Sequence, residues 1–342
     1  MIRICAITIT LMLAIGSLLN AQDGVDSIPS IMDRGMALHD EGKYEMSLVE
    51  YRKALEMEPK NGFVNYEMAL SYYYLGDKVH AEEFAKTASK EDSESGVQGV
   101  ILLGSLYDEQ GNGKKSVKTY KSAIKRFGDY YLIWFNLGVT YNGMGQHEDA
   151  ADAFENALAN KLDHSSSHYA LGTMQQLQGK RAEAMLPLYF FLMLEPDTDR
   201  SKQAVASLND LWSQGVSRDG DENITISIGA ESSKDPMRMS DMMISILQAS
   251  DGLEQNEGKS DFELYHEKAT ALFKYLAEMD LSNRDDYYTQ YYIPFFQRIA
   301  DSEHSVAFTH YVLHSLYPES SKWVELNTEQ LESFFNWLDE TE

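Results

Sequence analysis

Residues 134–159 read WFNLGVTYNGMGQHEDAADAFENALA, and the fold of the first half follows from their pattern. Apolar residues recur at helical spacing on both sides of Gly145, so the stretch predicts two helices separated by a turn. Glycine suits the left-handed backbone that ends many helices, which explains Gly145. Gly138 and Ala157 are small where one helix must pack closely against another. The stretch therefore predicts a helical hairpin.

The same pattern recurs along the first half of the chain. Gly104 lies 34 residues before Gly138, and Gly172 lies 34 residues after it. Two further copies precede these, with Gly35 and Ala69 at the matching position. A fixed period of this length is typical of a repeat array, in which each unit buries its apolar face against its neighbours.

The pattern resembles the tetratricopeptide repeat over residues 28–198. The resemblance implies five pairs of antiparallel helices, with the first helix of each pair lining a concave face that binds a partner. The fifth copy departs from the pattern because Gln175 stands where an aromatic residue belongs. Pro187 should also kink its second helix, at a cost of about 3 kcal/mol, unless that helix starts late.

The expected fold class is all-α, a tetratricopeptide-type helical-hairpin solenoid followed by a smaller helical domain. The expected segments are a signal peptide at 1–21, five repeats at 28–198, a capping helix and linker region at 199–258, and a helical C-terminal domain at 259–342. Within the linker region, alternating isoleucines at 224–228 predict a short strand. The aromatic stripe from Tyr288 to Phe296 is typical of a helical core. No family is recognised in this half.

The N-terminus has the order of features found in a secretory signal. Arg3 precedes an apolar run from Ile4 to Leu19, and Ala21 follows at a break of small and polar residues. We expect cleavage after Ala21 and a periplasmic or secreted protein, with an uncleaved anchor as the alternative. The single cysteine, Cys5, lies before the apolar core, which does not favour lipidation. The mature chain would have no thiol for a disulfide or a metal.

The formal net charge of the chain is −25. A surface this acidic repels phosphate backbones and anionic lipid, so nucleic-acid binding and membrane docking are not expected. No stable membrane span is expected after signal cleavage. The acidity fits a role in solubility or, alternatively, attraction of cationic partners or divalent ions.

No cofactor, metal site or catalytic group is predicted. His310 and His314 lie one helical turn apart, but a third ligand and a general base are missing at the spacing that zinc hydrolases use. Asp219, Asp221 and Asn223 have the alternating spacing of a calcium loop, yet its turn glycine and final acid are absent. Phosphate-binding loops and nucleophile motifs are also absent from the sequence.

The resemblance places a set of largely aromatic and uncharged residues on the concave face. This predicted partner-binding groove consists of Phe63, Tyr66, Leu70, Tyr73, Tyr74, Ile101, Leu102, Phe135, Asn136, Val139, Asn142 and Tyr169. Family members that grip acidic chaperone tails use basic residues there, and this chain has none at the matching positions. Some of these aromatics could instead be covered by neighbouring helices.

The predicted function is an exported, non-catalytic interaction scaffold that binds a protein or peptide partner. Two alternatives remain open: an exported enzyme with its site in the C-terminal helical domain, and a glycan-binding protein that uses the aromatic groove. Convergent acids and histidines in one pocket would favour the enzyme, and a continuous open aromatic surface would favour the scaffold.

The order of charge, apolar run and small-residue break generates a prediction about processing. The exported protein should begin at Gln22, and its intact mass should correspond to residues 22–342. Mass spectrometry of the envelope and culture fractions measures this directly. Recovery of the full-length chain in the membrane fraction would contradict cleavage after Ala21.

Overall fold

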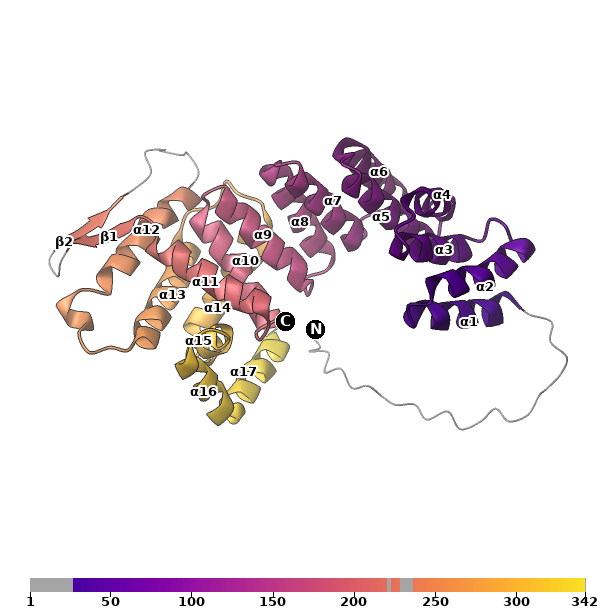
Figure 1. The fold of residues 1–342 in the computed structure, drawn as a ribbon. Helices are drawn as coiled ribbons and strands as arrows, with labels where there is room; N and C mark the ends of the chain where they lie inside the picture. Colours follow the sequence, from indigo (N-terminus) through magenta and orange to yellow (C-terminus); the bar gives the residue numbers. More distant parts are fainter. Residues whose placement is uncertain (1–26, 220–222, 228–235, 342) are drawn as a thin grey trace. The chain divides into compact units, whose positions relative to one another are not determined.

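The computed structural model describes residues 27–219, 223–227 and 236–341, and the predicted signal peptide lies outside this range (Figure 1). Ten helices follow one another in hairpin order along the repeat region. They are α1 (Ile28–Asp40), α2 (Tyr44–Met57), α3 (Gly62–Tyr74), α4 (Lys78–Ala88), α5 (Glu94–Glu109), α6 (Gly113–Phe127), α7 (Tyr131–Gly143), α8 (His147–Asn160), α9 (Ser165–Leu177) and α10 (Arg181–Leu194). The chain divides into two compact units, one ending at Gly145 and the other beginning at Gln146.

Close approach of paired helices organises the first unit. A Cβ on Gly35 of α1 would lie 2.2 Å from Tyr51 Cε1 of α2, and one on Gly104 of α5 would lie 2.3 Å from Tyr120 Cζ of α6. Both tyrosines are fully buried. The turn glycine Gly111 has a φ of 74° and donates its N–H to the carbonyl of Asp108. The helical hairpins predicted from the glycine spacing are therefore present.

The second unit continues from α8 to α10 into a largely helical remainder. Its further elements are α11 (Asp199–Ser213), β1 (Val216–Asp219), β2 (Asn223–Ile226), α12 (Met237–Ser250), a 3-10 turn (Glu254–Asn256), α13 (Asp261–Glu278), a π-helix (Tyr288–Tyr292), α14 (Ile293–Asp301), α15 (Ser305–Leu313), α16 (Pro318–Leu326) and α17 (Thr328–Thr341). The predicted all-α class is confirmed, with one small antiparallel hairpin in which β1 is the unpredicted partner of the predicted strand. The segment boundaries expected from the sequence stay a prediction.

The core of the second unit surrounds α10, in which every residue from Arg181 to Met193 is buried. Pro187 lies inside this helix, which neither starts late nor ends at the proline. Proline has no N–H, so the carbonyl four residues earlier, on Glu183, loses its helical partner. The hydroxyl of Tyr288 donates to that carbonyl at 3.1 Å. The aromatic stripe of the C-terminal half thus supplies the hydrogen bond that the repeat cannot make for itself.

A second tyrosine of the π-helix attaches to α9. His168 is fully buried, and its Nε2 lies 2.7 Å from the carbonyl of Leu162, which makes this nitrogen the donor. Its Nδ1 therefore accepts from the hydroxyl of Tyr292 at 2.6 Å. Burial lowers the pKa of His168 to about 3, so the imidazole stays neutral. As predicted, the stripe is core: Tyr288, Tyr292 and Phe296 are almost wholly buried.

Arg181 joins α10 to two later helices. Its guanidinium donates to the carbonyls of Leu211 and Trp212, where α11 ends, and to the carbonyl of Asp241 and the hydroxyl of Ser245 on α12. Cationic donors satisfy helix C-terminal carbonyls well, because both hydrogen bonding and the helix dipole favour them. This buried arginine therefore fixes α11 and α12 against the last repeat.

A charged cluster lies where the segment before the π-helix meets α8 and α10. Arg284 contacts Glu183 at 3.5 Å and Asp286 at 2.6 Å. The second oxygen of Asp286 accepts the backbone N–H groups of Tyr288 and Thr289. Burial, together with the negative charge of Asp286, raises the pKa of Glu155 to about 7. Glu155 is therefore an acid that the folded state holds in its protonated form more readily than the unfolded chain does.

The role of Tyr288 leads to a prediction about stability. Tyr288→Phe should destabilise the chain by about 1–3 kcal/mol, because it leaves the buried Glu183 carbonyl without its donor. In a Pro187→Ala background the restored N–H reaches that carbonyl, so the same change should cost clearly less. Urea unfolding followed by tryptophan fluorescence measures both costs, since Trp212, Trp323 and Trp337 report on the second unit. Equal costs in the two backgrounds would contradict the compensation.

The raised pKa of Glu155 leads to a prediction about pH. A folded-state pKa above the unfolded value means that the folded state binds more protons, so this group lowers stability as pH rises from about 4.5 through about 7. Glu155→Gln should therefore stabilise the chain relative to wild type at about pH 8, and much less at about pH 5. Thermal unfolding at both values tests this, with Glu148→Gln on the exposed side of α8 as control. A gain that does not grow with pH would count against it.

Candidate functional site

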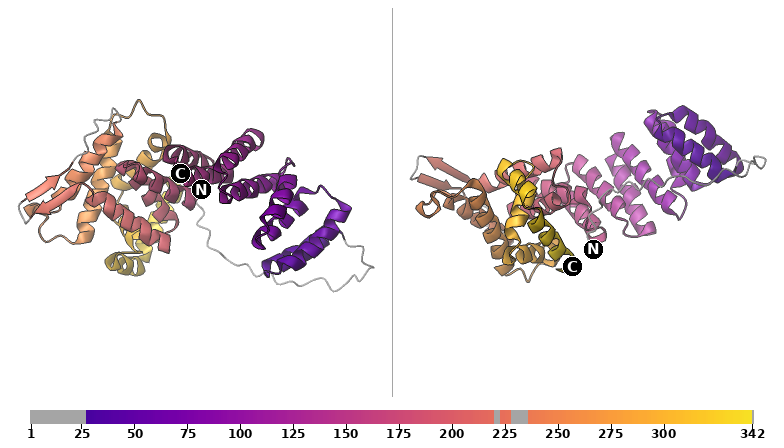
Figure 2. Two further views of the ribbon diagram at one scale, coloured as in Figure 1. Left: turned by 45° about the horizontal axis from the view of Figure 1, so that its top comes forward. Right: turned by 90° about the horizontal axis from the view of Figure 1, so that it is seen from below.

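The first helices of the unit that ends at Gly145 carry most of the predicted groove. In this unit α3 packs beside α5, and α5 packs beside α7, so their side chains form a row across successive hairpins. The order of these helices can be followed in the two views of Figure 2. The exposed and half-buried predicted residues of these helices are called the first-helix surface: Phe63, Tyr66, Leu70, Tyr73, Tyr74, Ile101, Phe135, Asn136, Val139 and Asn142.

Aromatic side chains concentrate on α3. Phe63 is 40% exposed and Tyr74 is 55% exposed, whereas Tyr66 and Tyr73 are half-buried. The ring of Tyr74 stacks on Tyr44 of α2 at a centroid distance of 5.1 Å and an interplanar angle of 8°. Packing of this kind holds a large exposed ring in place before any partner arrives, which lowers the entropy cost of binding.

The remaining predicted residues differ in where the structure places them. Leu102 is 9% exposed and packs with Leu103 and Leu106, so it belongs to the core between helices and is not an open contact. Asn136 donates its amide to the carbonyl of Leu132 at 2.8 Å. Tyr169 lies on α9 in the other unit, where its hydroxyl donates to Gln203.

Carboxylates accompany the aromatics on the first helices, among them Glu67, Asp108 and Glu109, and the predicted partner-binding groove did not include them. Burial raises the pKa of Glu67 to about 6, and burial also raises the pKa of Asp108. The pKa of Glu109 is lowered because Lys78 and the hydroxyl of Tyr73 hydrogen-bond to it, at 2.7 and 2.5 Å. The amino-acid composition of these helices could have indicated them, because Arg34 is the only lysine or arginine in α1, α3, α5 and α7 and the acids there have few basic neighbours.

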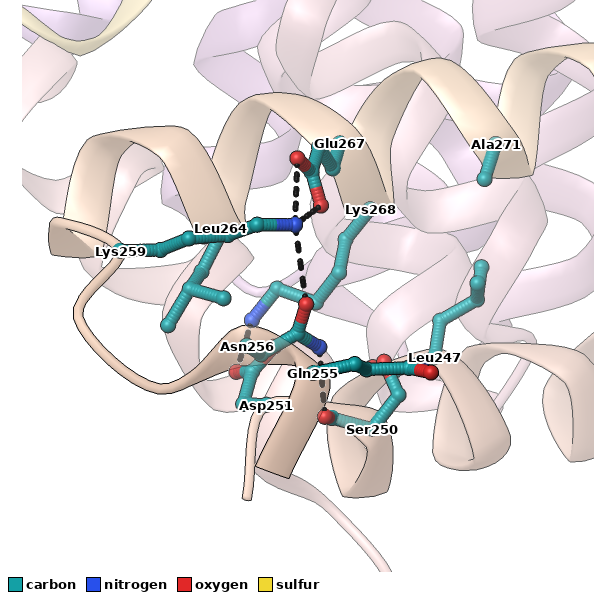
Figure 3. Close-up of a pocket in the computed structure, with 10 residues that line it drawn as sticks. All are labelled: Leu247, Ser250, Asp251, Gln255, Asn256, Lys259, Leu264, Glu267, Lys268 and Ala271. Carbon is teal, nitrogen blue, oxygen red and sulfur yellow. Dashed lines mark hydrogen bonds and ion pairs between the residues drawn. The ribbon is translucent and has the colours of Figure 1, made fainter. Parts of the chain in front are cut away.

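A polar pocket of about 320 Å³ lies in the second unit, between α12, the 3-10 turn and α13 (Figure 3). Lys268 is 8% exposed, and its ammonium lies 2.6 Å from Asp251 and 2.9 Å from Gln248. Lys259 lies 2.6 Å from Glu267 across the same pocket. These ion pairs fit a structural role in joining the two helices.

His310 and His314 do not converge on a common point. The ring of His310 stacks between the rings of Phe262 and Trp323, with centroid distances of 3.5 and 4.4 Å. Burial lowers the pKa of His310 to about 4. His314 contacts the carbonyl of Tyr311 through Nδ1. Within the described part of the chain, no group of three or more His, Cys, Asp or Glu residues is placed to hold a metal ion.

The calcium-like triplet is only partly described. Asp219 ends β1 and Asn223 begins β2, facing each other in the hairpin register, and Asp221 lies outside the described residues. None of the helices in the described ranges is long and apolar enough to cross a membrane.

Comparison with known proteins identifies the repeats. The family model for the tetratricopeptide repeat matches residues 28–61 and 131–164. A TPR repeat-containing protein of Methanocaldococcus jannaschii is 24% identical over 44% of this chain and 28% of its own length. The BBSome complex member bbs-4 of Caenorhabditis elegans is 25% identical over 40% of this chain and 31% of its own length. The chain thus spans about a third or less of these relatives.

Among solved structures, a thermophilic TPR protein of Thermus thermophilus is 22% identical, with a TM-score of 0.44, over 54% of this chain and all of its own. The pilF protein of Pseudomonas aeruginosa is 17% identical, with a TM-score of 0.47, over 54% of this chain and 84% of its own. The family matches cover α1 and α2, and α7 and α8. Together with the 34-residue period and the paired helices, these matches support the resemblance of the first half of the chain to tetratricopeptide repeats.

Proposed function

We propose that this protein is an exported, non-catalytic scaffold that binds a protein or peptide partner on its first-helix surface. The observation that carries the proposal is the exposure of large aromatic rings on α3, above all Tyr74 and Phe63. Tetratricopeptide repeats are protein-interaction modules, and they match this chain at its first and fourth hairpins. The N-terminal pattern around Ala21 supports export.

The physical argument is one of solvation. Exposed aromatic rings gain free energy when a partner covers them, and rigid aromatic side chains dominate the energetics of many interfaces. Tyr44 and His39 brace Tyr74, with ring centroids 5.1 and 5.3 Å away, so little side-chain entropy remains to be lost. The stacked pair lies beside Tyr73, whose ring centroid is 5.7 Å from that of Tyr74.

The second unit receives a structural role in this proposal. Two relatives are transferases by name, the human protein O-mannosyl-transferase TMTC2 and a probable N-acetylglucosaminyltransferase of Hordeum vulgare, but this chain spans 10% and 15% of their lengths. Tyr292 and Tyr288 bond to His168 of α9 and to the Glu183 carbonyl of α10, and Arg181 of α10 bonds to Ser245 of α12. That engagement supports a unit whose C-terminal helices cover the last repeat.

Alanine substitutions separate binding from folding. Tyr66→Ala, Tyr73→Ala and Phe135→Ala should each weaken partner binding by about 2 kcal/mol, near thirtyfold, at a true hot spot. The expected result in a pull-down from envelope extract is a set of proteins recovered by wild type and lost from all three variants. Quantitative mass spectrometry measures the recovery, and thermal unfolding measures the stability of each variant.

The matched control is Tyr107→Ala, which removes a ring that is only 2% exposed. It should lower stability by about 3–5 kcal/mol, as expected for loss of a core aromatic. If the three surface variants lose stability to the same extent, these residues are core between repeats. If they keep both stability and recovery, the first-helix surface is not the binding site.

A further inference from the structure

Charge is distributed unevenly over the unit that ends at Gly145. The first helices carry Asp33, Asp40, Glu67, Glu94, Asp108 and Glu109, whereas Arg34 is their only lysine or arginine and pairs with Glu50 of α2 at 3.1 Å. The second helix α6 shows the opposite pattern, with no acid and a row of lysines at 114, 118, 121 and 125. Apart from Arg34, the lysines and arginines in the helices of this unit therefore lie on the second helices and not on the first helices.

We propose that the segment bound on the first-helix surface is cationic: a peptide stretch whose arginine or lysine side chains reach Glu67 and Asp108 while its apolar parts cover the tyrosines. This inference rests on the proposed function and names the chemistry of its partner. The proposed partner has the opposite charge to the acidic tails that some tetratricopeptide repeat proteins bind.

Asp108 gives the first reason. Its side chain is half-buried on α5, close to Gly113 and to Gly143 at the end of α7, and within the described residues its carboxylate has no hydrogen-bond or ion-pair partner. Glu67 is also half-buried, and its hydrogen bond to the hydroxyl of Tyr51 is a long one, at 3.5 Å. Partly desolvated carboxylates without cations are unfavourable, so a bound guanidinium or ammonium would stabilise both.

The aromatic rings give the second reason. Arginine and lysine are attracted to the faces of tyrosine rings, and the exposed ring of Tyr74 lies on the same helix as Glu67. A cationic segment can therefore contact carboxylates and rings together. An acidic segment would place like charges beside partly buried acids, which is costly at an interface.

The net charge gives the third reason. At −25, the long-range field of the protein attracts cations and accelerates their encounter. Within the described structure, no lysine of α6 forms an ion pair with Glu67 or Asp108. The negative potential at these two carboxylates is therefore not neutralised by α6. The local and the overall electrostatics therefore favour the same class of partner.

The test uses the purified full chain and fluorescent peptide libraries that share apolar positions and differ at the polar ones, which carry arginine, serine or glutamate. In fluorescence anisotropy the arginine library should bind about tenfold or more tighter than the serine library, and its affinity should fall as salt rises. Glu67→Gln and Asp108→Asn should each remove much of that advantage. Glu83→Gln, an exposed acid on the second helix α4, is the matched control and should leave it intact.

Equal affinities for the three libraries, a preference for glutamate, or no binding by any library would overturn the cationic partner. An arginine preference that survives in both acid variants would overturn the assignment to Glu67 and Asp108. The proposed function is judged separately by Tyr73→Ala and Phe135→Ala in the pull-down. Loss of partner recovery there, together with no charge preference in the libraries, would retain the scaffold and reject the cationic partner.

Discussion

In the hairpins around Gly35, Gly104 and Gly172, a side chain of the second helix fills the space that a Cβ on the first helix would occupy. Tyr51 against Gly35 and Tyr120 against Gly104 are two examples, each pair 16 residues apart, and Leu188 lies 2.7 Å from the position of a Cβ on Gly172. The contact brings the backbones close and fixes which faces of the helices remain outside. Because the same spacing recurs, the first helices present their other faces in a regular row, and this row is where Tyr74 and Phe63 are exposed.

The last repeat differs from the others because its second helix, α10, contains a proline and depends on the C-terminal helices. Pro187 breaks the hydrogen-bond ladder of α10, and a helix with an unpaired buried carbonyl would be unstable at the end of a solenoid. Tyr288 resolves this by donating to that carbonyl, and Arg181 ties the same helix to α11 and α12. The last repeat and the C-terminal helices are therefore parts of one core, which explains why all of the residues from Arg181 to Met193 are buried.

The two units differ in how their polar and aromatic side chains are engaged. In the second unit, the polar groups that sequence reasoning would examine for chemistry, such as His168, Lys268 and His310, are held by hydrogen bonds, ion pairs or aromatic stacking. In the first unit, aromatic rings and the carboxylate of Asp108 remain accessible or unpaired among the described residues. The exposed rings of Phe63 and Tyr74 and the carboxylate of Asp108 lie on first helices, and the free energy that a partner would gain by covering them is the physical basis of the proposed scaffold.

Local spacing was enough to predict the hairpin array, because glycine, alanine and aromatic residues repeat at a period that stacked helix pairs require. It also identified the C-terminal aromatic stripe as core. Spacing did not reveal that Leu102 is buried, that Glu67 accompanies the tyrosines, or that Tyr288 completes the helix around Pro187. Periodicity shows which face of a helix is apolar, but burial and pairing depend on residues far away in sequence, and no local pattern encodes those contacts.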